Sequence, residues 1–211
     1  HTTGDRSKMI SKPLRAALLG ALIIASGMAQ ADPVKIGFVT TLTTPAAVIG
    51  EDMQRSVELA LEHLGQTMGG LGVELMVEDD GFKPDIGKQK TDKLVKQDDV
   101  DFVAGYIWSH VLLASYQSVV RADKFLISAN AGPSLVAGKR CHPNFFSTSW
   151  QNDQTPMAMG EYLNREGVRS LYIMAPNYAA GKDMVRGVES VFRGEVVGKD
   201  LTKWGADAQL D

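Results

Sequence analysis

Short apolar runs alternate along the chain with stretches in which apolar residues recur every three or four positions. Runs rich in β-branched residues are typical of buried strands, and the wider spacing is typical of helices. We predict strands at residues 34–42, 71–79, 100–107, 124–129, 145–149, 168–176 and 195–200. We predict helices at residues 51–65, 83–97, 111–122, 152–167 and 180–194. This alternation indicates an α/β fold with parallel sheets and helices on both faces.

Residues that start or stop helices support several of these boundaries. We expect Gly65 and Gly167 to close two of the helices, because glycine favours the position just beyond a helix end. Pro84 fits the first turn of its helix, where proline is tolerated. Asn152 or Asp153 is expected to cap the helix that follows, since their side chains accept backbone N–H groups.

The domain organisation changes near residues 130–150, where aromatic, proline and asparagine residues cluster and residues 130–144 are typical of a loop. We therefore predict a crossing between two lobes. Lobe 1 is assigned to residues 32–150 and the first part of lobe 2 to residues 151–211. The last residues follow a strand without a closing helix, so we expect the chain to be truncated within lobe 2.

The N-terminal region has the features of an export signal. Within residues 9–31, two basic residues precede an apolar run at 16–27, which is short for a membrane span. Small residues follow, and we predict a signal peptide cleaved after Ala31 and a periplasmic protein. Residues 1–8 are polar, precede Met9, have no clear origin and are left out of the fold assignment.

Composition excludes some functions. The 211 residues are 44% hydrophobic and 22% charged, with a formal net charge of −3. A weakly acidic chain has no bulk attraction for nucleic acid, so no such partner is expected. Cys141 is the one cysteine, which rules out an internal disulfide. Cys141 and His142 could bind a metal or act in nucleophilic chemistry, but no further cysteine or acidic cluster accompanies them. We favour a small apolar residue before a turn, and expect no metal site.

In an open parallel sheet, ligands bind beyond the carboxyl ends of the strands. The loop after the first strand, residues 40–52, lacks the glycine patterns of dinucleotide and phosphate-binding loops. Its four threonines either hold a small anion together with the helix N-terminus or satisfy the backbone of the turn. Thr43 is a weaker ligand candidate, as are His110 and Asn177 in later loops.

The sharpest pattern is Trp108-Ser109-His110, where a strand gives way to a helix. Trp108 could form a wall against an apolar or aromatic ligand. Ser109 is expected at the helix N-cap, where a ligand carboxylate could share the free amides and the helix dipole. His110 could donate to a ligand oxygen, although we favour a surface position in the first helical turn.

Two later loops add candidates. Asn130 ends a strand and offers an amide donor and acceptor, either to a ligand or to its own loop. Tyr178, beside Asn177, could close over a ligand from lobe 2 or simply be half-buried. Asp79 and Asp80 point opposite ways at a strand end and are interpreted as a turn. The sequence carries no pattern typical of a hydrolase, a zinc protease or a calcium-binding loop, so we expect no enzyme activity.

Five stretches, in order and with matching loop lengths, resemble one known family. They are "VKIGFVTTLTTPAAVIGEDMQRSVELALEHL", "GGLGVELMVEDDGFKPDIGKQKTDKLV", "VDFVAGYIWSHVLLASYQSVV", "FLISANAGPS" and "NYAAGKDMVRGVE". From about Pro33 onward, the chain resembles the periplasmic solute-binding subunits of ABC importers of the branched-chain amino-acid type. The resemblance implies a type I periplasmic binding fold, in which two lobes close on a ligand. It also implies a ligand range that includes amides, urea and aromatic carboxylates.

The resemblance further implies roles for single residues. Ser109 matches the serine that receives the ligand's carboxylate or amino group, and the segment after the fourth strand matches ligand-contacting backbone. The first loop and lobe 2 each match a position that contributes a ligand-contacting side chain. The residues matched to ligand contacts are Ile49, Ser109, Asn130, Ala131 and Gly132, and Tyr178 lies close to the tyrosine that lobe 2 contributes.

The chain departs from the amino-acid binders of that family. Trp108 stands where they commonly carry a small residue or a disulfide cysteine, and the partner cysteine near Gly81 and Phe82 is absent. Asn130 is larger than its counterpart, and no threonine follows it. These differences argue against leucine, isoleucine and valine and leave room for an aromatic or other carboxylate against Trp108.

We therefore predict an exported solute-binding protein. It would capture an amino acid, an amide or an aromatic carboxylate between two lobes and deliver it to an inner-membrane ABC permease, as a monomer without a cofactor. One alternative is an exported sensor of the same fold that signals to a membrane partner. Another is a secreted α/β enzyme that shares only the alternation of strands and helices.

Overall fold

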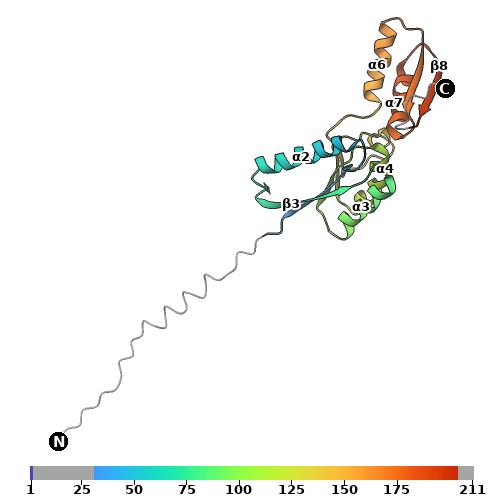
Figure 1. Ribbon diagram of the computed structural model, residues 1–211. Coiled ribbons are helices and arrows are strands. Elements are labelled where there is room, and N and C mark those ends of the chain that lie inside the picture. The colour runs from blue at the N-terminus through green and yellow to red at the C-terminus, as the bar shows by residue number, and fades with distance from the viewer. Residues whose placement is uncertain (2–30, 204–211) are drawn as a thin grey trace. The chain divides into compact units, whose positions relative to one another are not determined.

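The computed structural model describes residue 1 and residues 31–203 (Figure 1). The predicted signal peptide, apart from Ala31, lies outside the described residues. In chain order the elements are β1 (Val34–Thr40), α2 (Ala47–His63), β2 (Thr67–Met68), β3 (Leu71–Asp79), α3 (Pro84–Lys96), β4 (Phe102–Gly105), α4 (Ser109–Val120), β5 (Phe125–Ser128), α5 (Ser134–Ala137), β6 (Phe145–Ser147), α6 (Gln154–Arg165), β7 (Ser170–Pro176), α7 (Ala179–Val191) and β8 (Glu195–Thr202).

The predicted α/β architecture is confirmed. Six strands form one sheet in the order β2-β3-β1-β4-β5-β6, and all pairings are parallel except that of the short β2 with β3. From β1 the chain passes outward to β3, whereas from β4 it passes outward in the opposite direction to β5. The strand order therefore reverses between β1 and β4. In open α/β sheets, ligands bind outside the carboxyl ends of the strands at such a reversal.

Helices cover both faces of this sheet (Figure 1). α3 and α4 pack against each other, and α2 packs on β1 from the opposite face. The two helix layers cover both faces, as is usual for a parallel sheet. The core lies mainly between the sheet and the helix pair α3 and α4. Its fully buried apolar side chains are Val39, Leu94, Val100, Val103, Tyr106, Val111, Leu112, Val119 and Leu126.

The second sheet is smaller. β7 and β8 pair in parallel, with a register shift between Leu171 and Tyr172, and α6 packs against α7. Apolar side chains stay exposed on this sheet, among them Tyr172 at 54% and Met174 at 59%. The region from α6 to β8 therefore buries little apolar surface of its own.

Several predicted boundaries are confirmed, but α4 begins at Ser109, two residues before its predicted start, and the predicted start of α2 is wrong as well. Gly65 lies beyond the end of α2 with a φ of 65°, and Pro84 is the first residue of α3. However, α2 begins at Ala47, four residues before the predicted start. Thr44 has a φ of 147°, and its carbonyl accepts the Ala47 N–H at 3.0 Å, so the helix starts directly from that turn. Val48, one of the added residues, is exposed. The added residues therefore do not show apolar residues at helical spacing.

A tight turn at the end of β4 redirects the chain toward α4. Gly105 has a φ of 112°, and a Cβ there would lie 2.3 Å from the Val39 carbonyl oxygen, so only glycine fits. Tyr106 follows with a φ of 63°, which is rare for a bulky residue. Its ring is fully buried, and its hydroxyl is hydrogen-bonded to Thr91 Oγ1 at 2.7 Å. The turn lies between β4 and Trp108, which is the last residue before α4.

Candidate functional site

Trp108 lies beside the reversal in strand order, just before α4. Its side chain is 6% exposed, and its indole Nε1–H donates to Thr41 Oγ1 at 2.9 Å. The Thr41 hydroxyl donates in turn to Asp80 Oδ1 at 2.5 Å. Because Thr41 follows β1 and Asp80 follows β3, three adjacent strand ends are joined by one chain of buried side chains.

An aromatic ring also packs on Trp108. The rings of Phe82 and Trp108 have centroids 4.8 Å apart in an edge-to-face arrangement, which is a favourable geometry for aromatic pairs. These are the two places at which the resemblance implies paired cysteines in amino-acid binders. The structure therefore shows that the two positions are neighbours here as well, joined by an aromatic contact.

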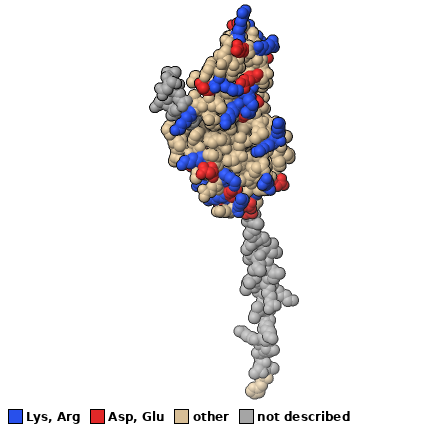
Figure 2. All heavy atoms as spheres, turned by 90° about the vertical axis from the view of Figure 1, so that its right-hand side faces the viewer, with Lys and Arg blue, Asp and Glu red and all other residues tan. Residues whose placement is uncertain are grey.

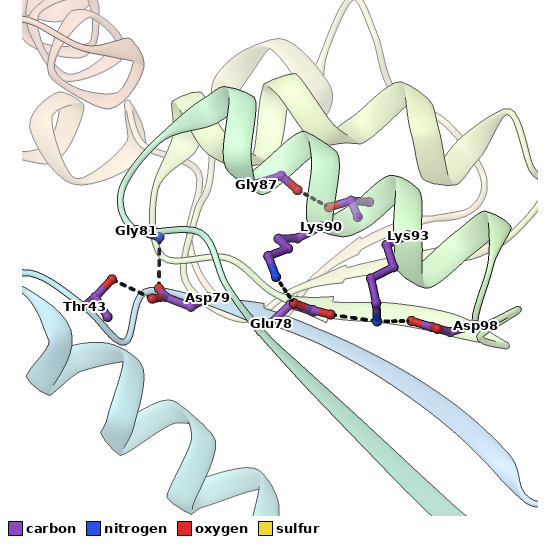
Figure 3. Close-up of polar contacts among 9 residues, drawn as sticks. Thr43, Glu78, Asp79, Gly81, Gly87, Lys90, Lys93 and Asp98 are labelled. Atoms are coloured by element: carbon purple, nitrogen blue, oxygen red, sulfur yellow. Dashed lines mark hydrogen bonds and ion pairs between the residues drawn. The ribbon is translucent and has the colours of Figure 1, made fainter.

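The adjacent carboxylates Asp79 and Asp80 have different environments. Asp79 accepts the N–H groups of Leu42 and Gly81 and the hydroxyl of Thr43, as Figure 3 shows in part. Burial alone would raise the pKa of Asp79, but these donors lower it below its ordinary value. Burial raises the pKa of Asp80, and the bonds from Thr41 and the Phe82 N–H offset this only in part. The predicted turn is confirmed, and both carboxylates serve to hold the first loop.

Glu78, one residue earlier on β3, points to the helix layer instead. Figure 3 shows its carboxylate between Lys90 and Lys93 of α3, at 2.7 and 2.9 Å. Lys93 also reaches Asp98 at 2.7 Å. This ion-pair network fixes α3 to β3 and so supports the loop that begins at Asp79.

The predicted N-cap role of Ser109 is wrong. The N-cap position belongs to Trp108, which has extended backbone and makes no side-chain cap bond, and Ser109 is the first residue of α4. Ser109 is 2% exposed, and its Oγ accepts the Asn152 Nδ2–H at 3.0 Å. The hydroxyl is thus engaged by the segment that leads to α6 and does not cap its own helix.

Asn152 is a buried polar residue whose contacts the sequence does not reveal. It is 3% exposed and donates from Nδ2 to Asp183 Oδ2 at 3.1 Å as well as to Ser109. Asp183 also accepts the Ser134 N–H at 3.0 Å and pairs with Arg186. Because Asn152 precedes α6, a role as helix cap was enough to explain an asparagine at this position. No local feature of the sequence indicated partners so distant along the chain.

His110 and Tyr178 lie against the same aromatic group. The Tyr178 ring lies 6.4 Å from the Trp108 ring and 5.6 Å from the His110 ring. His110 Nε2 lies 3.3 Å from the Phe82 carbonyl oxygen, and burial lowers the pKa of His110. Burial also raises the pKa of Tyr178. The structure therefore brings three of the predicted residues, Trp108, His110 and Tyr178, together, and the Phe82 ring contacts the first two.

Residues 130–132 serve the backbone of this region. Asn130 Nδ2 donates to the Ile107 carbonyl at 2.9 Å, which is the loop-stabilising role that the sequence left open. The Ala131 N–H donates to the Tyr106 carbonyl at 3.0 Å, and the Gly132 carbonyl accepts the Asn152 N–H at 2.8 Å. A Cβ on Gly132 would lie 1.9 Å from the Trp150 carbonyl oxygen, so this close approach requires glycine.

The remaining candidates lie outside this buried group. Ile49 is 41% exposed on α2, Asn177 is exposed after β7, and Thr43 is tied to Asp79. Cys141 has an exposed, free thiol. Ligand contacts of Ile49, Asn177 and Thr43 stay predictions.

Within residue 1 and residues 31–203, no cluster of three or more histidine, cysteine or acidic side chains is placed to hold a metal ion. The helices in the same range include none with the length and apolar character needed to cross a membrane. Figure 2 shows basic and acidic side chains interspersed over one face, as the small net charge leads one to expect.

A family model described as "Periplasmic binding protein" matches residues 33–209. Leu/Ile/Val-binding protein homolog 6 of Brucella abortus (strain 2308) is 23% identical over 190 residues, covering 88% of this chain and 48% of that protein. The chain thus spans about half the length of the curated relatives it matches.

Solved structures agree with this match. The solute-binding protein of an ABC transporter from R. palustris, in complex with benzoate, is 28% identical with a TM-score of 0.78, over 83% of this chain and 49% of that one. The ABC transporter substrate-binding protein from Sphaerobacter thermophilus is 30% identical with a TM-score of 0.73, over 84% and 49%.

Proposed function

The chain belongs to the periplasmic binding protein family, and on that basis we propose that it binds a small organic carboxylate between two lobes and delivers it to an ABC permease. The matched proteins are binding proteins, and the two solved structures are binding proteins of ABC transporters. They support solute binding without chemical conversion. The periplasm is the proposed location, in keeping with the family and with the predicted signal peptide over residues 9–31. Closure of the lobes would follow from a solute that contacts both.

One observation carries the proposal. The Trp108 and Tyr178 rings lie 6.4 Å apart beside the reversal in strand order of the six-stranded sheet, where ligands of open α/β sheets bind, and Ser109 follows Trp108 as the first residue of α4. Two of these residues come from the first sheet and its helices, and Tyr178 precedes α7. A solute held here would contact side chains from both parts of the chain.

The donors at this place suit a carboxylate. Asn152 uses a lone pair of the Ser109 oxygen, which leaves the hydroxyl proton to donate to a solute oxygen. The first backbone N–H groups of α4 have no partner within the helix, and the helix dipole favours negative charge beside them. Together these groups provide several convergent donors for one carboxylate.

The aromatic side chains favour an apolar or aromatic body on that carboxylate. Phe82, Trp108, His110 and Tyr178 form a group of contacting rings beside this place and carry no formal negative charge. A zwitterionic amino acid would need an acidic partner for its ammonium group. The R. palustris protein in complex with benzoate supports an aromatic acid as the first compound to test.

Native mass spectrometry of the purified full-length protein tests the proposal. We expect an intact complex with a small carboxylate that copurifies, and a fluorescence titration of the emptied protein in which benzoate binds more tightly than leucine. The compound should be recovered unchanged after incubation. A copurifying compound without a carboxylate, or recovery of a chemically altered compound, would overturn the proposal.

A further inference from the structure

Hydrogen bonds join the Trp108 indole to two further buried side chains, Thr41 and Asp80. Thr41 and Asp80 are both 0% exposed, and they follow the central strands β1 and β3. The Trp108 Nε1–H bonds to Thr41 Oγ1 at 2.9 Å, and Thr41 Oγ1 bonds to Asp80 Oδ1 at 2.5 Å. We use the name indole relay for these three side chains.

While Asp80 is ionised, the direction of every proton in the indole relay is fixed. An indole N–H can only donate, and a carboxylate can only accept. The single proton of the Thr41 hydroxyl must therefore point to Asp80, while a lone pair receives the indole. Asp80 is fixed in turn by the Phe82 N–H at 2.8 Å, and the ring of Phe82 packs on Trp108. The Trp108 ring is thus held by its N–H and by its edge contact.

This arrangement limits what Trp108 can offer to a solute. Because the indole N–H is used inside the protein, a solute that contacts Trp108 would meet the ring and not the N–H. Aromatic contacts depend on the mutual angle of the rings, whereas burial of an aliphatic group is non-directional. A fixed indole angle therefore matters more for an aromatic solute than for an aliphatic one.

We infer that Thr41 is a specificity-determining positioning residue, which acts with Asp80 to fix the Trp108 ring and so favours aromatic over aliphatic carboxylates. The inference rests on the proposed function, since it assumes that the solute contacts Trp108. Thr41 itself acts through the indole and is not required to touch the solute.

Three threonine variants of the full-length protein test the inference, with benzoate and leucine as probes in parallel titrations. Thr41→Val keeps the shape but removes the hydroxyl, and we expect the ratio of benzoate to leucine affinity to fall about tenfold. Thr41→Ser restores the hydroxyl and should change the ratio less than about twofold. Thr91→Val removes another fully buried hydroxyl, bonded to Tyr106, and should leave the ratio unchanged.

A second readout does not depend on any solute. The indole N–H signal of Trp108, assigned with Trp108→Phe, should exchange faster with solvent in Thr41→Val than in the parent or Thr91→Val. An unchanged affinity ratio in folded Thr41→Val, or an equal fall in Thr91→Val, would overturn the inference while the proposed function stands. If the parent binds neither probe but its indole exchange behaves as expected, the proposed ligand class fails and the specificity role falls with it.

Discussion

The region of six strands, residues 34–147, and the region of two strands, residues 154–202, are built from the same repeat of strand and helix, yet they differ in what they bury. In the first region, sheet and helices enclose a continuous core around side chains such as Leu94 and Val103, both 0% exposed. In the second region only Ala175, Ala180 and Val185 are buried apolar residues.

The difference describes the 211-residue chain, which spans about half the length of its curated relatives. A pair of strands with one layer of helices leaves apolar surface open, as at Met174, and gains little from hydrophobic burial. The second region is instead held to the first by buried polar contacts, above all those of Asn152 with Ser109 and Asp183. The first region is therefore expected to determine stability, and the contacts between the regions to determine the geometry of the site.

The largest expected effect separates two leucines in the 211-residue chain. Leu112 is 0% exposed in the first region and Leu201 is 40% exposed on β8. Leu112→Ala should lower the free energy of unfolding by about 2–5 kcal/mol, and Leu201→Ala by less than about 1 kcal/mol. Urea unfolding followed by circular dichroism measures both. Equal losses would contradict the contrast between the regions. A loss for Leu201→Ala that stays small in the full-length protein would extend the contrast to that protein.

A smaller effect is expected at the joint between the regions. Gly132→Ala places a Cβ against the Trp150 carbonyl, and we expect a loss of about 1–3 kcal/mol. The Asn152 N–H, which donates to the Gly132 carbonyl, should also exchange faster with solvent. Gly72→Ala is the control, because a Cβ there meets only the Pro33 side chain, at 4.0 Å. Undisturbed exchange at Asn152 in Gly132→Ala would show that the joint tolerates the added methyl group.

The smallest effect is electrostatic and belongs to α3 of the first region. Burial would raise the pKa of Asp92, but hydrogen bonds from Lys88, Lys96 and Ser118 lower it from 3.8 to about 2. A lowered folded-state pKa stabilises the chain above about pH 4, and this contribution is lost as the pH falls toward 2. Because the partners Lys88 and Lys96 are more than half exposed, solvent screens these pairs, and Asp92→Asn should reduce stability at pH 7 by less than about 1 kcal/mol.

Acid titration of stability checks the sign of that effect. Between pH 4 and pH 2 the parent should lose stability more steeply than Asp92→Asn, because only the parent must protonate this paired carboxylate. A variant that loses stability as steeply as the parent would show that the pairs of Asp92 with Lys88 and Lys96 contribute nothing to folding.

Local patterns allowed most of the fold to be predicted. Periodicity located the strands and helices, and Gly65 and Pro84 marked helix ends through their own backbone preferences. The start of α2 was missed because Thr44 adopts a positive φ that its residue type does not announce. A four-residue helix and a two-residue strand, α5 and β2, are too short to leave a period.

The candidate site could be predicted only in part. The rule for open sheets led to Trp108 and Ser109, since both follow a strand at the ligand-binding edge. The partners of these residues are 67 and 43 positions away, at Thr41 and Asn152. Such pairs arise from tertiary packing, and each partner already had a sufficient local explanation as a turn or cap residue. The sequence therefore predicted which strand ends carry the candidate residues, but not the hydrogen bonds that orient their side chains.

Isothermal titration of the full-length protein with benzoate, comparing the parent with Trp108→Ala, tests the proposed site most directly. If the solute rests on the indole beside the reversal in strand order, the variant should stay folded and bind more weakly by about 1–3 kcal/mol. The same affinity in a folded Trp108→Ala variant would place the solute elsewhere and contradict the account.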